Sequence, residues 1–276
     1  MFLSTLGPGL LVAGACAGGP RPEAAAARGG GGVRVEVAAS FLHGEVDGFL
    51  QIPRGGQPGS SSRHRPALGE MGIDHVAALD VGGSVEWRRS RVRAGARFVP
   101  LRGRATLTRD RVSGKVTFPA GTSVRGALDL DWYHLTYERR FVLDEDARGR
   151  RLTLRPGFGV AVLDFDYELH GPGLVGTRRA FTKWALRLGA TARWELSDEL
   201  SLQAHLLRGL PIGMQPRLST MGLRGRYRLW RGRSSAAWAS VGVAYDEISF
   251  EDEQTLPNRI EARLGPMLLV GLQVRF

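Results

Sequence analysis

Residues 259–276 alternate apolar and polar side chains almost throughout, and this stretch constrains the fold most. A period of two indicates a β-strand with one apolar and one polar face. Strands of soluble domains typically have about 5–6 residues, whereas a tilted strand needs roughly 9–11 to cross a bilayer. This stretch is long enough to cross. Its even positions are Ile260, Ala262, Leu264, Pro266, Leu268, Val270, Leu272, Val274 and Phe276; its odd positions are mostly polar or glycine, with Met267 and Leu269 as exceptions.

Nine earlier segments show related alternation, so the sequence predicts ten strands in all. An even number is typical of bacterial single-chain membrane barrels. Connections after odd-numbered strands are mostly long, and those after even-numbered strands are mostly short. This asymmetry predicts extracellular loops, periplasmic turns, and both ends of the barrel in the periplasm. The nine segments are residues 33–52, 74–88, 91–108, 122–141, 151–169, 179–196, 200–212, 217–230 and 235–250.

The alternation changes phase within two of these strands. In the first, the apolar positions change from odd (Val33 to Phe41) to even (Val46 to Ile52). A slip of one residue moves every side chain to the other face, so a β-bulge near residues 42–45 is expected. In the fifth, the apolar positions change from even to odd after Val162.

Aromatic residues near the strand ends complete the pattern: Trp87, Trp184, Trp194, Tyr227 and Trp230. Aromatic girdles mark the two interfaces of a membrane barrel. The stretch 259–276 resembles the closing strand of a bacterial outer-membrane β-barrel, and its terminal Phe276 resembles the barrel-assembly signal. We therefore expect an all-β, closed, antiparallel up-and-down transmembrane barrel in the outer membrane. The resemblance covers residues 33–276 and is to the broad class of small OmpA- and OmpW-like proteins. The soluble alternative is a lipocalin-like barrel or a sandwich.

The composition permits one large all-β domain of this kind. The chain has 276 residues and a net charge of +11, carried almost entirely by arginine. The arginines are spread over alternating strand positions and form no nucleic-acid motif, so nucleic-acid binding is not expected. Beyond the N-terminal segment, no run of about 18 apolar residues predicts a membrane helix.

The N-terminal residues resemble an export signal. Residues 1–17 contain a short apolar core and small residues that suit cleavage. The single cysteine, Cys16, also stands in a lipoprotein-like box, so plain cleavage and lipidation both remain open. Residues 18–32 are rich in Gly, Pro and Ala and predict a flexible linker.

Polar strand faces predict a charged lumen, on the assumption that the apolar faces meet lipid. The lumen is then either an anion-leaning conduit or a salt-bridged plug, and the narrow interior of a small barrel favours the plug. Arg224, Arg226 and Arg228 are the densest group and the best candidates for anion contact. The expected network comprises Arg93, Arg97, Arg125, Arg187, Arg193, Arg224, Arg226, Arg228, Glu261 and Arg263.

Two carboxylate–histidine groups are candidate catalytic sites, because such pairs can activate water. They are Asp129, Asp131 and His134 on the fourth strand, and Asp164, Asp166 and His170 on the fifth. The ten-stranded omptin proteases resemble this chain in barrel size only, and their motifs are not matched. His134 has the wrong parity relative to Asp131, and paired structural charges are the favoured interpretation. No metal or cofactor motif is present.

The expected role is that of a structural or ligand-contacting surface protein, with residues 53–72 as the main exposed recognition loop and a helical turn at 68–71. A passive small-solute channel and a rim hydrolase are the alternatives. The expected partners are outer-membrane lipid and the barrel-assembly machinery, and the expected state is a monomer.

Overall fold

In the computed structural model, which describes residues 32–52, 64–146, 150–252 and 257–276, a single sheet closes into a barrel. Ten strands form the ring, each antiparallel to its neighbours. In ring order they are β1 (Arg34–Gln51), β2 (His75–Trp87), β3 (Ser90–Phe98) continued by β4 (Pro100–Thr106), β7 (Ser123–Arg139), β9 (Arg151–His170), β10 (Thr177–Glu195), β11 (Leu200–Gly209), β12 (Arg217–Arg231), β13 (Ala236–Glu251) and β14 (Arg259–Arg275).

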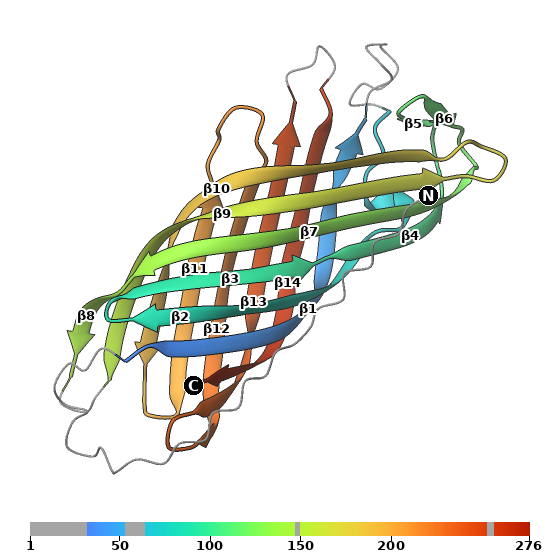
Figure 1. Ribbon diagram of the computed structural model, residues 1–276. Coiled ribbons are helices and arrows are strands. Elements are labelled where there is room, and N and C mark those ends of the chain that lie inside the picture. Colours follow the sequence, from blue (N-terminus) through green and yellow to red (C-terminus); the bar gives the residue numbers. More distant parts are fainter. Residues whose placement is uncertain (1–31, 53–63, 147–149, 253–256) are drawn as a thin grey trace, which may run out of the picture. The chain divides into compact units, whose positions relative to one another are not determined.

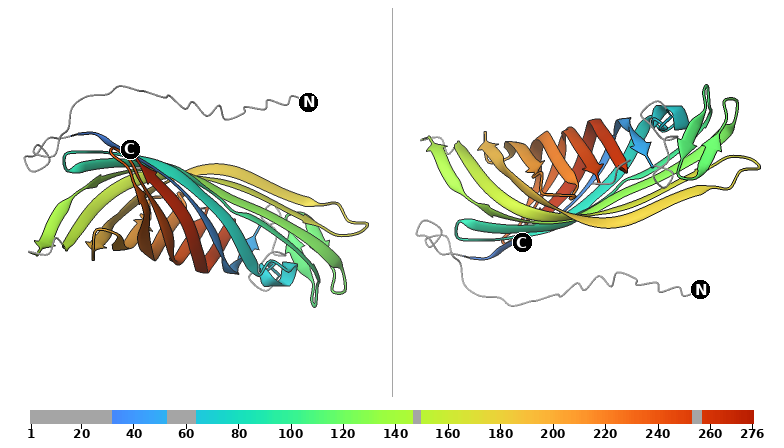
Figure 2. Two further views of the ribbon diagram at one scale, coloured as in Figure 1. Left: turned by 90° about the horizontal axis from the view of Figure 1, so that it is seen from below. Right: turned by 90° about the horizontal axis from the view of Figure 1, so that it is seen from above.

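The predicted strands are confirmed to within a few residues. The third is divided at Val99, where β3 ends and β4 begins, and both halves pair with β7. A short strand, β8 (Phe141–Glu145), extends β7 and pairs with the start of β9. Closure is made by β14, which pairs with β13 on one side and β1 on the other. In Figures 1 and 2, β7, β9 and β10 run at a steep angle to β12, β13 and β14 on the opposite side of the barrel.

The barrel has two ends, which we name from β1. The lower end is where β1 begins and β14 finishes, and the upper end is where β1 finishes and β14 begins (Figure 1). The connections at the lower end are mostly short, for example residues 88–89, 196–199 and 232–235. The upper end carries the longer connections, including residues 52–74 and 107–122.

The outer wall of the lower half is a continuous apolar belt. On β10, outward-facing side chains run from Trp184 through Leu186 and Leu188 to Trp194, all exposed. At about 3.3 Å per residue and a tilt of about 40°, this run rises roughly 25 Å, the height of a membrane barrel's lipid-facing band. Trp87, Trp194, Tyr227 and Trp230 lie exposed near its lower edge, where they form the predicted aromatic girdle, and Trp184 alone of the predicted set marks its upper edge.

Above the belt, both faces of the wall reverse their chemistry. On β9 the outward side chains change from Phe158, Val160 and Val162 to Asp164 and Asp166. The inward side chains change from Thr153 and Arg155 to large apolar residues. The upper half therefore has the apolar interior and polar exterior of a water-soluble barrel. The inward apolar set on β9 is Leu163, Phe165, Tyr167 and Leu169.

This reversal corrects the interpretation of the phase changes. In β1 the side chains keep strict alternation past Phe41, which faces out, and Leu42, which is fully buried, and β1 pairs with β2 without interruption. The phase change therefore marks the point where the apolar face moves from the outside to the inside. A register shift does occur beside Gly44, but the extra residue lies in β14, between Leu264 and Met267. Gly265 there has φ 123°, which favours glycine.

The bulge in β14 also corrects the assignment of its faces. Ile260, Ala262 and Leu264 point into the barrel, and so do Met267 and Leu269 beyond the bulge. Leu268, Val270 and Leu272 face outward. Likewise, the apolar residues of the fourth predicted strand face the interior and not lipid: Val124, Leu128, Leu130 and Trp132.

Loop segments complete the apolar core at the upper end. The expected helical turn is present as the 3₁₀ helix η1 (Gly69–Met71), and Leu68 and Met71 are completely buried beneath it. A small hairpin, β5 (Arg111–Ser113) and β6 (Val116–Phe118), adds the buried Phe118. Most of the proposed recognition loop, residues 53–63, lies outside the described residues. Its second part, residues 64–72, buries Pro66, Leu68 and Met71 as a cap on the apolar core, and its other residues, apart from the exposed Gly69, are partly buried.

The two halves of the cap are joined through one carboxylate. Glu70 accepts hydrogen bonds from Arg109 at 2.7 Å and from Arg111 at 2.7 Å, and also from the backbone N–H of Ala67 at 3.1 Å. Partial burial opposes ionisation of Glu70, but the two guanidinium groups outweigh it and lower its pKa to about 2. An ionised Glu70 therefore fastens η1 to the β5–β6 hairpin.

Candidate anion-binding vestibule

The interior of the lower half is lined by charged and hydroxyl side chains, and many of them pair with one another. Glu138 accepts hydrogen bonds from Arg91 at 2.6 Å and Thr191 at 3.0 Å. Glu86 pairs with Arg155 and Arg140, each at 3.1 Å. Two cavities within this interior are each only about 40 Å³, close to the space that one water molecule needs. The polar interior is therefore packed rather than open.

A buried ion triad separates the polar interior from the apolar core. Arg97 lies between Asp80 and Asp246 and pairs with both carboxylates. Asp246 is completely buried, and Arg97 also lies 5.2 Å from the ring of Trp132, a member of the apolar core. Buried charges of this kind require their partners, because an unpaired charge in a low-dielectric interior is strongly unfavourable.

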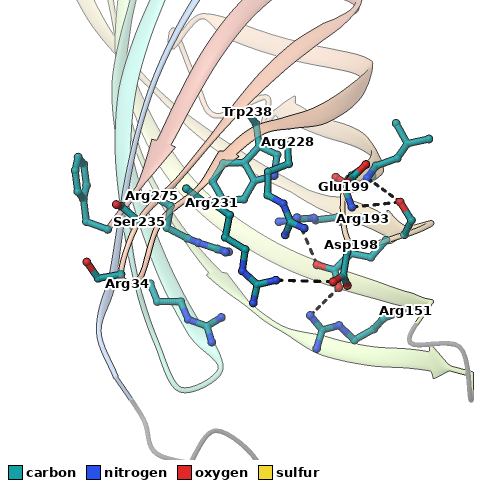
Figure 3. Close-up of a pocket in the computed structure, with 18 of the residues that line it drawn as sticks. Arg34, Arg151, Arg193, Asp198, Glu199, Arg228, Arg231, Ser235, Trp238 and Arg275 are labelled. Carbon is teal, nitrogen blue, oxygen red and sulfur yellow. Dashed lines mark hydrogen bonds and ion pairs between the residues drawn. The ribbon is translucent and has the colours of Figure 1, made fainter. Parts of the chain in front are cut away.

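Below the packed interior, the lower mouth widens into a pocket of about 470 Å³, which we call the vestibule (Figure 3). Strand ends and lower turns supply its walls, and seven arginine side chains outnumber three carboxylate side chains there. The arginines are Arg34, Arg151, Arg193, Arg228, Arg231, Arg233 and Arg275; the carboxylates are Glu195, Asp198 and Glu199.

Only part of this positive charge is neutralised from within. Glu195 pairs with Arg151 at 2.7 Å and with Arg193 at 3.4 Å, and Asp198 lies 3.8 Å from Arg231. Within the described residues, Arg34, Arg228 and Arg275 form no ion pair within 4 Å. The vestibule thus keeps an excess of guanidinium groups, each a fixed fork of donors suited to phosphate or carboxylate.

Further guanidinium groups lie next to the vestibule, beside its lining residue Trp238. Trp238 lies between two arginines, with Arg275 at 4.7 Å and Arg226 at 5.2 Å from its ring. Arg226 is 2 % exposed, and within the described part of the chain its one ion-pair partner within 4 Å is Glu36, at 3.9 Å. Two of its guanidinium nitrogens are buried without a hydrogen-bond partner, as are the Nε atoms of Arg193 and Arg224.

The predicted charge network is placed partly as expected. Arg93, Arg97, Arg187, Arg193, Arg224 and Arg226 face the interior, and Arg228 lines the vestibule. Arg125, Glu261 and Arg263 were wrongly assigned to the lumen, because they face outward from the upper half, where polar side chains meet water. Sequence reasoning also missed Arg34, Arg231, Arg275 and Trp238, which converge only because their strand ends and turns meet at one mouth.

The two carboxylate–histidine groups do not form catalytic pairs. His134 faces the interior, whereas Asp129 and Asp131 face outward, as their parity indicated. The strands do neighbour each other, with Asp129 opposite Asp166 and Asp131 opposite Asp164. Each carboxylate has another partner: Arg102 for Asp129, the Val99 amide for Asp131, Thr182 for Asp164 and Arg178 for Asp166. His170 lies 3.3 Å from Glu168.

Among the described residues, no three His, Cys, Asp or Glu side chains gather closely enough to hold a metal ion. None of their helices is long and apolar enough to cross a membrane.

Comparisons with known proteins give structural likeness only. No family model matches the sequence, and no curated protein matches it significantly. The chain is similar to the outer-membrane protease OmpT from Escherichia coli, with 8 % identity and a TM-score of 0.47 over 90 % of this chain and 97 % of that one. It is also similar to the translocator domain of the autotransporter NalP from Neisseria meningitidis, with 13 % identity and a TM-score of 0.36 over 87 % of each chain.

The barrel's own features define its class. Lipid-exposed backbone must be hydrogen-bonded internally, which a closed ring of strands achieves, and the apolar belt with aromatic edges is the lipid-facing surface of such a ring. The chain is a transmembrane β-barrel of the bacterial outer-membrane class, located in the outer membrane. The narrower resemblance to OmpA- and OmpW-like proteins is not supported by the matches.

Proposed function

We propose that this protein is a non-conducting outer-membrane barrel that binds a small multivalent anion in its lower vestibule. The observation that carries the proposal is the excess of guanidinium groups around a pocket that ends blindly. With the mostly short turns at the lower end taken as periplasmic, the ligand reaches the vestibule from the periplasm.

The vestibule is closed at its upper side because side chains fill the barrel above it. A solute above the vestibule meets the Arg97 triad and then completely buried apolar side chains, among them Trp132, Phe165 and Tyr167. A small barrel's interior is about filled by side chains, and a continuous apolar layer opposes the passage of hydrated ions. This weighs against the passive-channel alternative.

The ligand class follows from the chemistry of the walls. Converging arginines bind phosphate or carboxylate oxygens through paired N–H donors, and walls of one charge sign in a concave site focus the field on the ligand. Among the residues that the structure describes, the vestibule's apolar lining is limited to Leu200, Ala236, Trp238 and Phe276, so a polar anion is favoured over a lipid tail.

Titration calorimetry on the folded chain in nonionic detergent tests the binding, with tripolyphosphate and citrate as probes. We expect saturable binding of at least one probe that weakens with salt. Replacing Arg228 and Arg275 by glutamine together should weaken it at least about tenfold, since each charged hydrogen bond contributes about 1.5–3 kcal/mol. Arg139→Gln, on the outer face at the lower end, is the matched control and should leave binding unchanged.

Planar-bilayer recording tests the non-conducting part separately. Folded protein should give no single-channel steps. Regular steps would contradict the blind end and favour the channel, whereas equal probe binding by the double variant and the wild type would contradict the vestibule site. Lipid and the barrel-assembly machinery remain the expected partners, and the monomer the expected state.

A further inference from the structure

A second group of cations lies on the outer wall of the upper half, far from the vestibule along the strands. Arg104 on β4 stands directly opposite Arg125 on β7, and Arg125 stands directly opposite His170 on β9. All three side chains are exposed on the outward face. They line a pocket of about 320 Å³ together with Ser123, Gly171 and Pro172.

This arrangement is unfavourable without an anion. Side chains directly opposite in neighbouring antiparallel strands have Cβ atoms about 5 Å apart, and like charges in such pairs are destabilising. Within the described residues, neither Arg104 nor Arg125 forms an ion pair within 4 Å. We call Arg104, Arg125 and His170 the cationic row. Its two arginines therefore place two permanent positive charges side by side, and neither has a carboxylate partner among the described residues.

The wall immediately below differs, which makes the row distinctive. Arg102 forms a two-pronged pair with Asp129, at 2.7 and 3.0 Å, and Arg178 pairs with both Asp166 and Glu168. These arginines have their carboxylates on the neighbouring strand. Arg104 and Arg125 belong to the same two strands, β4 and β7, and lack such partners.

We propose that Arg104, Arg125 and His170 form a binding site for a phosphate monoester. Two guanidinium forks can hold phosphate oxygens in bidentate fashion, and the Ser123 hydroxyl can donate a further hydrogen bond. His170 forms the third side of the pocket, with its Nε2 3.3 Å from Glu168. The site faces outward, so the phosphate comes from the surroundings of the barrel and not from its interior.

The height of the site restricts the source of the phosphate. His170 lies eight residues beyond Val162, the last belt residue of β9, which at about 3.3 Å per residue and a tilt of about 40° is roughly 20 Å at most above the belt. The headgroup region of a bilayer adds only about 5–8 Å to each side of the hydrocarbon. The phosphate is therefore carried either by a large sugar-bearing lipid headgroup or by a soluble molecule.

The test measures binding to folded full-length protein in nonionic detergent, with two probes. Glucose 6-phosphate represents the soluble source, and a phosphorylated glycolipid in bicelles, with its dephosphorylated form as the blank, represents the lipid source. Saturable binding of either probe is expected, and the double variant Arg104→Gln/Arg125→Gln should bind at least about tenfold more weakly. Arg178→Gln removes one charge from the same wall but leaves the row intact, so it is the matched control.

Stability gives a second readout that separates binding from a structural role. Without ligand, the double variant should unfold at the same temperature as the wild type or higher, because a repulsion has been removed. The bound probe should raise the unfolding temperature of the wild type and not that of the double variant. If the wild type binds one probe more tightly than the other, that preference shows whether the phosphate is carried by a soluble molecule or by a lipid. Failure of both probes to bind, or equal weakening by Arg178→Gln, would overturn the proposal.

Discussion

The lower and upper halves of this barrel use the same ten strands in opposite ways. In the lower half the apolar side chains face lipid and the interior holds ion pairs such as Arg91 with Glu138. In the upper half the apolar side chains fill the interior and the ion pairs lie on the outer wall, as Arg102 with Asp129 does. The backbone continues through the boundary with its hydrogen-bond ladder intact along β7, β9 and β10.

The contrast between the two halves separates two properties of the barrel: closure of the ring, which the chain sets, and the face that carries apolar side chains, which the surroundings set. Every strand residue can satisfy its backbone within the ladder in either half, so closure is independent of the solvent outside. The choice of face is decided by whether lipid or water surrounds the wall. The upper half is therefore held by a packed core, and the lower half by lipid contact outside and charge pairing inside.

The largest expected effect separates core from belt on one strand. Phe165 is completely buried and stacks on Phe181 at 4.6 Å between ring centroids, whereas Phe158 on the same strand is exposed on the belt. Phe165→Ala should lower the free energy of unfolding by about 3–5 kcal/mol, because it leaves a cavity. Phe158→Ala leaves none and should cost clearly less. Denaturant titration in lipid vesicles measures both, and equal losses would contradict the distinction between core and belt.

The buried triad at the boundary should be nearly as sensitive. Arg97→Met leaves Asp80 and Asp246 without their shared partner and should cost about 3–5 kcal/mol. Arg102→Met breaks an exposed pair and should cost under about 1 kcal/mol. The same titration compares them. A small effect of Arg97→Met would show that water reaches this layer and that the apolar core does not seal it.

Added charge on the outer face of β10 should locate the membrane boundary. Leu188→Arg places a guanidinium on the belt and should cost about 2–4 kcal/mol in a bilayer. Thr182→Arg, on the same face but above the belt and beside Asp164, should cost almost nothing. In detergent micelles, which adapt to the protein, the two should differ less. Similar losses of stability at both positions in a bilayer would show that the membrane boundary on β10 does not lie between residues 182 and 188.

The smallest expected effect concerns the cap of the upper half. Because the pKa of Glu70 is depressed to about 2, its ionised form stabilises the folded cap fully above its ordinary pKa of about 4.3, and this is lost as the pH falls toward 2. After allowance for solvent screening of this part-exposed group, the contribution is about 1 kcal/mol. Glu70→Gln should speed hydrogen exchange of the Ala67 amide at pH 7, and by a smaller factor at pH 2, where only part of Glu70 is ionised. If neither the substitution nor the change of pH alters exchange of the Ala67 amide, Glu70 does not fasten η1 to the β5–β6 hairpin.

The strands were predictable because alternation is a local property. The limits of β10, its outward apolar face and the opposed parity of Asp131 and His134 all follow from counting residues by twos. Alternation does not say which face is inside, so Arg125, Glu261 and Arg263 were assigned to the lumen on the assumption that apolar faces always meet lipid. The phase change at Val162 was visible in the sequence, and the carboxylates beyond it on the former lipid face were the available signal for the reversal.

The vestibule was only partly predictable, for a different reason. Arg193 and Arg228 belong to alternating strands, but Arg34, Arg231 and Arg275 lie at strand ends and come together through ring closure. The pairing of β1 with β14 joins residues more than two hundred positions apart, which no local pattern specifies. A sequence signal does exist in hindsight, since arginine stands near the lower end of many of the strands.

Spin labels along the outer face of β9 test the reversal of the two halves most directly. Single cysteines in a Cys16→Ala background at positions 154, 158, 160, 162, 164, 166 and 168 would carry nitroxides in a lipid bilayer, probed by dissolved oxygen and by a water-soluble nickel chelate. Oxygen should dominate relaxation up to Val162, and the nickel chelate should dominate from Asp164 onward. Oxygen dominance that continues through Glu168, or the absence of any crossover, would contradict the reversal.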